Sequence, residues 1–552
     1  MRFNLFFALG VAMIFAACSQ SVSPPSDDEE TSTVSSSSKK GKSSSSKENE
    51  KHSSSSADKQ TNSSSSEKVD SDKSSSSSVD ELDDDCVGDT GEPWDGTTAK
   101  DFACGAGTKL SPYVILTAEQ LAHLSFVVNA GDKDYSGKYF KLGADIKLNK
   151  GDVIDEKGAL VGDSTKLHKW TPIGNSSVSF DGNFDGAGHT ISGMFINTTS
   201  THNGLFGNSS GTVQNLTVEN SWVYGGQFTG GVLGLNVGTV ESVTNAASVS
   251  GPDECVGGVL GKSSQRQYQY NSILKKLKNN GIVVGKKNVG GVAGCATYVT
   301  VEEVENIAPI EGFGFVGGVF GGIGSASKND IRNTKNSGRI IGSHFVGGIS
   351  GHCGGLGLNI SSYQETSSYS CSNSTSWPCG KFMQAVNIAP ISGKYYVGGI
   401  LGVACGGSIS LLSNDASIEG QYGTAGIVGS AAYVTSENMY NKGDVYGNDY
   451  VGGIFSYNKE GVTSSAYSTG KVDGDSLVGL MIGYNYNTTM ADYYYLEQGD
   501  QEPFGLNNGG GVATPKTADE MKSEDFAELL GEAFTYDSGL NGGFPVLVWE
   551  NE

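Results

Sequence analysis

The sequence predicts an all-β protein, a parallel β-helix whose coils of about 27 residues stack on one another, with short helical caps at both ends. The strongest observation is a repeated motif of two glycines followed by Val or Ile, whose copies recur mostly 27 residues apart. Clear copies begin at Gly230, Gly257, Gly290, Gly317, Gly347, Gly398 and Gly452, and degenerate copies at Ala425 and Gly479. A fixed period of this size is typical of a solenoid in which each repeat forms one coil.

An asparagine marker keeps step with the glycine motif. From each marker to the next motif the distance is 11 residues, or 12 in one repeat, whereas the distance from a motif to the next marker ranges from 15 to 40 residues. The markers are Asn245, Asn279, Asn306, Asn336, Asn387, Asn414 and Asn441, with Ser468 in the last place. One half of each coil therefore has a fixed length, and the other half accepts insertions, which should gather on one face.

The short segments between the glycines have the residue composition of β-strands. Runs such as 281–285 and 338–342 place β-branched residues between two glycines. The 80 glycines exclude long helices and suit tight turns that need a positive φ. We expect the marker asparagines to hydrogen-bond from coil to coil across ~4.8 Å. The alternative is that each Asn only tolerates a left-handed turn, and both readings lead to the same fold.

Two capping boxes predict helices that flank the array. Thr117-Ala118-Glu119-Gln120 opens a short apolar helix from Leu121 to Val128, and Thr517-Ala518-Asp519-Glu520 opens a second helix that runs to Leu530. We expect both helices to cover the bare strand edges at the ends of the stack. The predicted domains are an N-terminal cap region, 86–150, the β-helix, 151–500, and a C-terminal cap, 501–552.

Residues 1–17 have the composition of an export signal. Arg2 and the apolar run 5–15 precede two small residues and then Cys18. The segment resembles a bacterial lipoprotein signal peptide, although Phe15 stands where Leu is usual, and the alternative is an ordinary secretory signal. The resemblance implies that a lipid on Cys18 attaches the protein to a membrane, and Ser19 favours the outer membrane. No other apolar run approaches the ~20 residues that span a bilayer.

Residues 18–85 form a serine-rich linker in which blocks of Ser alternate with Lys, Asp and Glu. Nothing in this stretch is apolar enough to build a core, so the sequence predicts disorder. A flexible chain of this length would span roughly 45 Å. The predicted location is therefore the outer membrane or cell surface of a bacterium, with the folded part held clear of the lipid.

Eight cysteines remain after Cys18, and in an exported chain they indicate disulfides. Two of them occupy nearly equivalent places in adjacent repeats, and two others lie inside the longest insertion. The expected pairs are Cys353–Cys405, Cys371–Cys379, Cys86–Cys104 and Cys255–Cys295. Spacing alone does not prove this connectivity.

The array resembles the GLUG-type repeat proteins of bacterial surfaces. The segment Gly204-Leu205-Phe206-Gly207 matches the Gly-Leu-apolar-Gly core for which the family is named. The segments 135–142, 170–174 and 180–191 match the sequence that precedes this core. The resemblance covers roughly residues 92–552. It implies a right-handed parallel β-helix and, for many members, an adhesive role at the cell surface. It implies no catalytic residues, because the family shares none.

One short motif is a weak candidate for a metal site. Asp181, Asn183 and Asp185 match the first half of a calcium loop, but the closing Glu is absent and no helices are predicted beside it, so a structural turn is the preferred reading. No other cofactor is predicted. The net charge of −23 argues against nucleic acid and against anionic polymers as partners.

The insertions are the candidate binding face, because loops on a rigid scaffold commonly carry binding residues. Two insertions contain side chains suited to stacking on sugars or anchoring a protein, namely Arg266, Tyr268 and Tyr270 in one, and Tyr363, Tyr369 and Trp377 in the other. The alternative is that the insertions are tolerated on the surface of the scaffold and bind no partner. The leading hypothesis is a non-enzymatic surface protein that binds an extracellular polysaccharide or a surface protein. The alternatives are a polysaccharide lyase or hydrolase on this scaffold, which would need carboxylates, and a structural spacer of the envelope.

Overall fold

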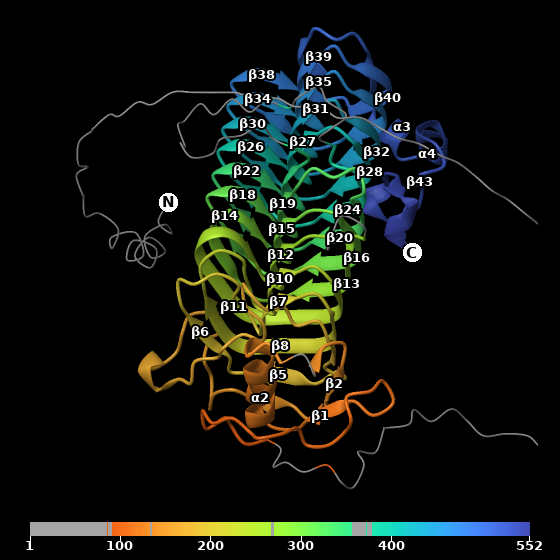
Figure 1. The fold of residues 1–552 in the computed structure, drawn as a ribbon. Helices are drawn as coiled ribbons and strands as arrows, with labels where there is room; N and C mark the ends of the chain where they lie inside the picture. The colour runs from red at the N-terminus through yellow and green to blue at the C-terminus, as the bar shows by residue number, and fades with distance from the viewer. Residues whose placement is uncertain are drawn as a thin grey trace, which may run out of the picture. The chain divides into compact units, whose positions relative to one another are not determined.

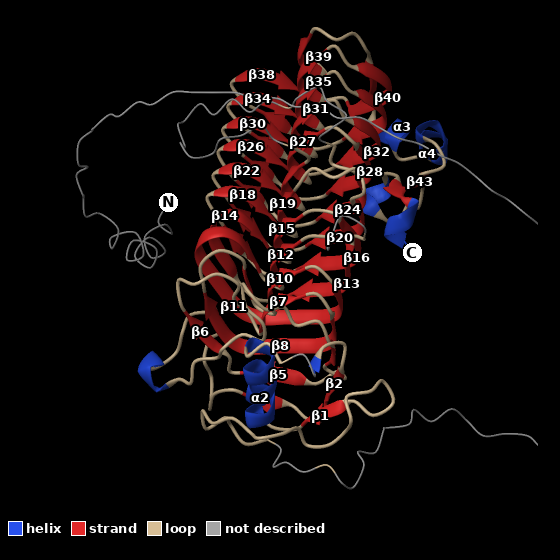
Figure 2. Cartoon of the chain, in the orientation of Figure 1, coloured by secondary structure: helices blue, strands red, loops and turns tan. Residues whose placement is uncertain are grey.

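A computed structural model describes residue 86 and residues 91–132, 135–265, 270–355, 371 and 378–551. The part of the chain from Val79 to Glu552 is one compact unit. Its strands stack coil on coil, as Figure 1 shows, and Figure 2 shows that strands dominate over helices. Every pairing between named strands is parallel except β43 (Phe534–Thr535) with β44 (Val546–Leu547). The predicted parallel β-solenoid is confirmed.

Each regular coil contributes one long strand and three shorter segments. The long strands, each paired with its neighbours one coil away, follow the N-terminal strands β1 (Tyr113–Ile115), β2 (Tyr139–Leu142) and β4 (Asn183–Asp185). They are β8 (Thr212–Tyr224), β11 (Thr239–Gly257), β13 (Ser272–Asn279), β16 (Val299–Asn306), β20 (Asp330–Asn336), β24 (Lys381–Asn387), β28 (Ser408–Asn414), β32 (Thr435–Asn441), β36 (Val462–Ser468), β40 (Thr489–Leu496) and β42 (Ala513–Lys516).

Two further columns of short strands continue the same sheet. The first contains β6 (Phe195–Asn197), β17 (Ile310–Glu311), β21 (Ile340–Ile341), β25 (Ile391–Ser392), β29 (Ile418–Glu419), β33 (Val445–Tyr446) and β37 (Val472–Asp473). The short strands β3 (Ile146–Lys147) and β5 (Thr190–Ser192) instead continue the column of long strands, because β5 pairs with Thr217–Glu219 of β8. The second contains β9 (Thr229–Gly230), β14 (Val283–Gly290), β18 (Gly314–Gly317), β22 (His344–Gly347), β26 (Tyr395–Gly398), β30 (Tyr422–Ala425), β34 (Asp449–Gly452) and β38 (Ser476–Gly479). In the early coils β8, β11 and β14 run through more than one column.

A separate sheet of 11 strands closes each coil. It contains β7 (Phe206–Ser209), β10 (Leu233–Asn236), β12 (Leu260–Ser263), β15 (Ala293–Ala296), β19 (Phe320–Ile323), β23 (Ser350–Cys353), β27 (Leu401–Cys405), β31 (Val428–Ala432), β35 (Phe455–Lys459), β39 (Ile482–Tyr486) and β41 (Phe504–Asn507). The turn into this sheet carries the glycine motif, and its third residue, such as Val232 or Ile400, is fully buried in the continuous core.

The glycine pair is required by close approach. A Cβ on Gly231 would lie 2.0 Å from the Oδ1 atom of Asn245 and 2.6 Å from the carbonyl oxygen of Gly258. A Cβ on the first glycine, Gly230, would lie 2.3 Å from the carbonyl oxygen of Leu233. None of these motif glycines has a positive φ, so the expectation that they serve left-handed turns is wrong for them. The left-handed positions belong to other residues, described below.

The asparagine markers form a continuous ladder through the core. Each Nδ2 atom donates to the Oδ1 atom of the next marker at 2.8–2.9 Å, from Asn245 to Asn441. The same Nδ2 atom also donates to the carbonyl oxygen two residues ahead, as Asn414 does to Ala416. All these side chains are fully buried. The predicted ladder is confirmed, and it satisfies amides that would otherwise be costly to bury.

The N-terminal helix packs into the end of the core. Helix α2 (Ala118–Asn129) begins with the predicted capping box on Thr117, and Leu121 and Leu124 are fully buried in the same cluster as the coil interior. Figure 1 shows α2 at the end of the stack that carries β1 and β2. This arrangement matches the expected N-terminal cap.

The C-terminal helices lie elsewhere than expected. The capping box on Thr517 is present, but the predicted single helix is divided into α3 (Ala518–Met521) and α4 (Glu524–Leu530), because Ser523 caps a new start. These helices pack with β43 and β44 on the outer side of β32, β36 and β40. Figure 1 shows them beside the stack. The C-terminal segment therefore covers a lateral face of three consecutive coils.

Four disulfides join the described cysteines, and two of the expected pairs are exchanged. Cys86–Cys104 and Cys255–Cys295 form as expected. The other bonds are Cys353–Cys379 and Cys371–Cys405. Cys353 is in register with Ala404, so Cys405 lies one residue farther along its strand and points to the opposite face of the sheet. The expected Cys353–Cys405 pair is therefore wrong, and with it the Cys371–Cys379 pair.

Candidate functional site

Most of the side chains predicted to bind a partner lie outside the described residues. These are Arg266, Tyr268, Tyr363, Tyr369 and Trp377, and Cys18 also lies outside them. Tyr270 is described, and its side chain is strongly exposed. The roles of these residues stay predictions.

The weak calcium candidate lies on a strand. Asn183 and Asp185 belong to β4, and Asp181 precedes it. The carboxylate of Asp185 accepts hydrogen bonds from the side-chain amides of Gln214, at 3.1 Å, and Asn215, at 3.0 Å. A strand spreads alternate side chains apart, whereas a calcium loop folds around its ion, so these residues do not have the arrangement of such a loop. The weak calcium site stays a prediction. Among the described residues, no group of three His, Cys, Asp or Glu could hold a metal ion.

A column of left-handed residues runs along one corner of the solenoid, and we call it the corner column. Each member lies two residues before a glycine motif and has a positive φ. Its members are Phe228, Cys255, Asn288, Phe315, Phe345, Tyr396, Gly423, Tyr450 and Leu477. They face the outward side chains of the 11-stranded sheet: the amine of Lys262 lies 5.0 Å from the Phe228 ring, and Cys255 is bonded to Cys295.

The middle of this corner is filled by the protein itself. The rings of Phe315 and Phe345 stack at 4.9 Å, and Phe345 and Tyr396 stack at 5.4 Å. The His352 ring lies 4.6 Å from the Phe315 ring, and desolvation among these rings lowers its pKa to about 4. Cys371 joins this cluster through its disulfide to Cys405.

Beyond Cys371 the corner opens into a cavity of about 380 Å³, which we call the corner groove. This volume lies within the ~300–1,000 Å³ that is usual for ligand sites. Its lining consists almost entirely of tyrosines and small residues. The lining residues are Cys371, Tyr396, Tyr422, Gly423, Ala432, Tyr450, Ser456, Tyr457, Lys459 and Tyr484.

The tyrosines of the groove come from successive coils and touch one another. Tyr422 meets Tyr396 edge-on at 5.7 Å and lies 5.0 Å from Tyr450. Tyr484 lies 6.3 Å from Tyr450 and 5.3 Å from Tyr457. Because the coils are stacked, the rings follow the axis of the solenoid at intervals related to the ~4.8 Å strand spacing. The groove therefore offers ring faces to an elongated ligand.

The groove is polar but nearly uncharged. Burial raises the pKa of Tyr422 to about 12 and also raises the pKa values of Tyr396 and Tyr457, so these hydroxyls stay neutral at physiological pH. Neutral hydroxyls can both donate and accept hydrogen bonds. Among the described residues of the lining, Lys459 alone is charged, and its amine lies 3.7 Å from the Glu460 carboxylate.

A second set of tyrosines on the same coils is covered by the C-terminal segment, residues 517–551, which we call the clasp. Tyr440 and Tyr467 stack in parallel at 5.2 Å with 7° between their planes. Phe526 of the clasp meets Tyr467 at 5.8 Å and Tyr494 at 5.4 Å, edge-on in both cases. This apolar cluster is separate from the coil interior.

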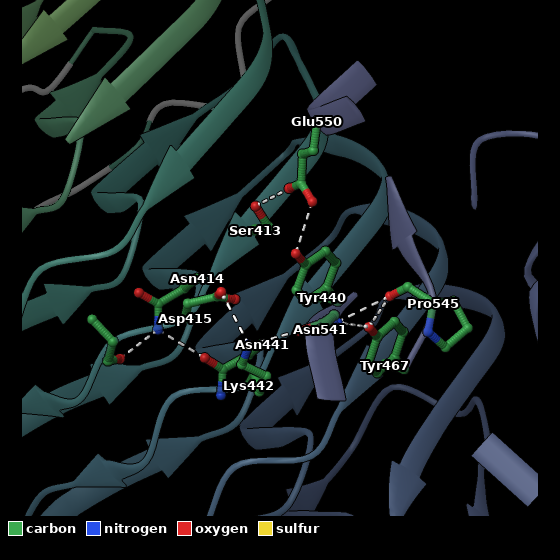
Figure 3. Close-up of polar contacts among 11 residues, drawn as sticks. Ser413, Asn414, Asp415, Tyr440, Asn441, Lys442, Tyr467, Asn541, Pro545 and Glu550 are labelled. Atoms are coloured by element: carbon green, nitrogen blue, oxygen red, sulfur yellow. Dashed lines mark hydrogen bonds and ion pairs between the residues drawn. The ribbon is translucent and has the colours of Figure 1, made fainter. Parts of the chain in front are cut away.

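Polar contacts fasten the clasp to the coils, as Figure 3 shows. The carboxylate of Glu550 accepts hydrogen bonds from the hydroxyls of Ser413 and Tyr440. The Tyr467 hydroxyl donates to the carbonyl oxygen of Pro545, and Lys442 donates to Asn541 at 2.6 Å. Burial raises the pKa of Glu550, because exclusion of water disfavours the charged form of its carboxyl group.

The corner groove is the functional candidate that sequence reasoning missed. The glycine and asparagine positions define the coil, whereas the groove is marked by the residue two places before each glycine motif. That position reads Phe, Phe, Tyr, Gly and Tyr in the repeats from Phe315 to Tyr450. An aromatic column on a solenoid, interrupted once, is the signal that could have located the groove.

Comparisons with known proteins give local similarity. No protein-family model matches the chain. A stretch of 125 residues is 37% identical to a protein of Evansella cellulosilytica described provisionally as a Gly-rich membrane protein, and covers 22% of this chain and 12% of that protein. A stretch of 146 residues is 32% identical to halomucin of Haloquadratum walsbyi, and covers 25% of this chain and 2% of halomucin. The chain thus spans a small part of either relative.

One solved structure is also similar, a Bacteroides ovatus protein described provisionally as an immunoglobulin A1 protease. It is 15% identical, with a TM-score of 0.27, over 82% of this chain and 98% of that chain. A likeness of this degree carries no argument about activity. None of these comparisons names the GLUG repeat, so that resemblance stays a prediction. In the described ranges, no helix is long and apolar enough to cross a membrane.

Proposed function

We propose that the protein is an exported, lipid-anchored surface protein that binds a neutral polysaccharide along the corner groove. The observation that carries this proposal is the cavity of about 380 Å³ lined by five tyrosines from successive coils. A sugar chain presents flat C–H faces and hydroxyl groups in alternation. Tyrosine rings suit the faces, and tyrosine hydroxyls suit the hydroxyl groups.

The shape of the groove favours a chain rather than a compact ligand. Tyr396, Tyr450 and Tyr484 belong to different coils, so their rings are displaced from one another along the solenoid axis. Successive coils are ~4.8 Å apart, a distance comparable to the length of one sugar unit. Each coil would therefore meet about one unit of an extended glycan.

The charge of the groove favours a neutral ligand. Lys459 is the one charged residue in the part of the lining that the structure describes, and Glu460 partly neutralises it. The net charge of −23 would repel an acidic polymer, as the sequence already indicated. A neutral glycan avoids both this repulsion and the cost of stripping water from a charged group.

The proposed surface location rests on three supports. Cys18 follows an apolar leader, four disulfides join the described cysteines, and a partial relative is described as a membrane protein. Disulfides of this density are typical of exported proteins. The serine-rich linker would then hold the groove away from the lipid surface.

A binding assay on the mature full-length protein tests the proposal. We expect it to sediment with insoluble neutral polysaccharides and to bind soluble neutral oligosaccharides with a change in tyrosine fluorescence, while acidic polysaccharides compete poorly. Absence of binding to every neutral glycan on an array would contradict the proposal. Release of reducing ends or unsaturated sugars from the polysaccharide would replace binding by catalysis as the function.

A further inference from the structure

One lysine of the coils lies between a carboxylate of the preceding coil and an amide of the clasp. The Nζ atom of Lys442 lies 3.1 Å from the Oδ2 atom of Asp415 and donates at 2.6 Å to the Oδ1 atom of Asn541. All three side chains are drawn in Figure 3. An amine, an amide carbonyl and a carboxylate that can carry protons are together the groups that an amide cross-link between two side chains requires.

The pairing of Asp415 with Lys442 follows from the repeat. Each of these residues comes directly after a marker asparagine, Asn414 or Asn441, so stacking places the two side chains one coil apart at the same corner. In the other repeats the residue after the marker is uncharged, namely Ala246, Asn280, Ile307, Ser337, Ile388 or Thr469. The carboxylate and the amine therefore occur together where the clasp brings up Asn541.

The clasp holds the Asn541 amide in one orientation. Its Nδ2 atom donates to the carbonyl oxygen of Pro545 at 3.2 Å and to the Tyr467 hydroxyl at 3.2 Å. A backbone carbonyl oxygen can only accept, so the amide nitrogen faces Pro545 and the amide oxygen faces Lys442. The amide carbon is one bond from that oxygen, so it lies at most ~3.8 Å from Nζ, close to the ~3–3.5 Å of a reactive arrangement.

The surroundings favour proton transfer to Asp415. Its Oδ1 atom is buried and, within the part of the chain that the structure describes, has no hydrogen-bond partner. A buried acceptor without a partner is costly, and a proton taken up by the carboxyl group reduces that cost. The Lys442 and Asp415 side chains are partly buried, and the Tyr467 ring beside the amide is fully buried, so little water reaches the reacting atoms.

We propose that Lys442 and Asn541 form an isopeptide bond that ties the clasp to the coils, with Asp415 as the catalytic proton carrier. Asp415 takes a proton from the Lys442 ammonium group, and the freed amine attacks the amide carbon of Asn541. A bond forms between Nζ and this carbon, and the bond from the carbon to Nδ2 breaks. Two of the three Nζ protons pass to the leaving nitrogen, one of them through Asp415, so ammonium departs and Asp415 regains its charge. The reaction needs no oxidant, reductant or cofactor.

The bond fixes the clasp at one point only. Residues 517–540 can still leave the coils, so a protease can still release this part of the clasp by cutting beside it. The inference does not depend on glycan binding, because Asp415, Lys442 and Asn541 lie outside the described lining of the corner groove. Its consequence is that the end of the clasp stays on the lateral face even after the chain has been cut.

Protease treatment of the natively folded, full-length mature protein tests the bond. After a cut between β42 and α3, and after reduction of the disulfides, the end of the clasp should stay joined to the coils on a denaturing gel. Peptide mass spectrometry should find the peptides of Lys442 and Asn541 joined, and lighter than their sum by one ammonia molecule. Separate pieces on the gel and two unlinked peptides would overturn the proposal, and this readout needs no variant.

Three variants assign the roles of the residues. Lys442→Arg keeps a cation beside Asp415 but provides no nucleophile, so the linked peptide should be absent. Asp415→Asn removes the proton acceptor, and the rate of linking after refolding should fall at least tenfold, since a positioned base typically contributes ~10²–10⁴-fold. The matched control is Lys471→Arg, because this lysine of the next coil pairs with Asp473, and it should link at the wild-type rate.

The variants can also contradict the assignment. The same linked mass in Lys442→Arg would mean that another amine forms the bond, and the proposal would fall. Linking of Asp415→Asn at the wild-type rate would remove Asp415 from the mechanism.

Discussion

The last coils carry two clusters of tyrosines that differ in what covers them. Tyr440, Tyr467 and Tyr494 lie under the clasp and are almost completely buried. The tyrosines of the corner groove arise from the same repeats and border an open cavity. Both clusters consist of rings spaced by the coil repeat. The clasp covers one of them, whereas the other borders the corner groove.

The covered cluster indicates what coil-spaced tyrosines bind. The clasp offers apolar edges to the ring faces, through Phe526, and oxygen acceptors to the hydroxyls, through Glu550 and Pro545. A ligand of the open groove should meet the same two requirements. A neutral sugar does so with its C–H faces and its hydroxyl oxygens, which is why the comparison favours a glycan over a purely apolar partner.

The largest effect should come from removing the central ring of the covered cluster. Tyr467→Ala deletes a fully buried side chain, its stack with Tyr440 and its hydrogen bond to Pro545. Truncating a buried aromatic residue typically costs about 3–5 kcal/mol. We expect the clasp to detach, so that limited proteolysis cuts between β42 and α3 well before the coils unfold.

The coils themselves should survive this change, because each coil is stabilised mainly by its neighbours. Glycan binding in the corner groove should also be unaffected, since Tyr467 is not part of its lining. A loss of glycan affinity in Tyr467→Ala would break the division between a cluster that stabilises the fold and a cluster that binds ligand.

The reciprocal change in the open cluster should have a smaller energetic effect of a different kind. Tyr450→Ala removes a ring that contacts Tyr422 and Tyr484 within the groove. We expect affinity for the neutral oligosaccharide to fall roughly tenfold, which corresponds to about 1.4 kcal/mol. The matched control is Tyr446→Ala, which removes an exposed tyrosine from the same coil outside the groove. Equal affinity losses in both variants, measured by fluorescence titration, would argue against the groove.

The solenoid was predictable because its determinants are local and repeated. In the clear copies of the motif the second glycine must lack a side chain, since the marker side chain lies where a Cβ would be, as Gly231 and the Oδ1 atom of Asn245 demonstrate. Two such constraints at a fixed separation specify the coil and its register. The same reasoning failed for Cys353 and Cys405, because counting residues from a motif does not reveal which face of a strand a side chain occupies.

The groove and the clasp were harder to predict because each depends on a departure from the repeat. Gly423 is inconspicuous among 80 glycines until its coil is aligned with the coils of Tyr396 and Tyr450. The clasp was expected at the end of the stack, where bare strand edges need a cover. Three tyrosines on adjacent coils instead provide an apolar lateral surface, and the chain folds back onto it.

The smallest effect concerns the pH dependence of the clasp. Burial raises the pKa of Glu550 above the ordinary 4.5, and the nearby Asp415 carboxylate adds to the shift. A carboxyl whose pKa is higher when docked stabilises docking fully below its undocked pKa, and this contribution is lost as the pH rises through the docked value. The clasp should therefore loosen from mild acid toward neutral pH. Glu550→Gln should abolish that trend at a cost within about 1 kcal/mol, because the amide retains hydrogen bonds to Ser413 and Tyr440.

The measurement is the rate at which a protease releases the clasp at each pH, given as the ratio of wild type to Glu550→Gln. The pH dependence of the protease itself cancels in this ratio. Lys442 is bonded to Asp415, and the substitution leaves both residues of this ion pair unchanged, so the pair does not distinguish the two proteins. A ratio that stays constant from pH 5 to 8 would mean that Glu550 does not titrate with docking. If the wild type releases the clasp faster than the variant as the pH rises, Glu550 is a pH-sensitive contact of the covered tyrosines. The corner groove has no buried carboxyl group among its described lining residues.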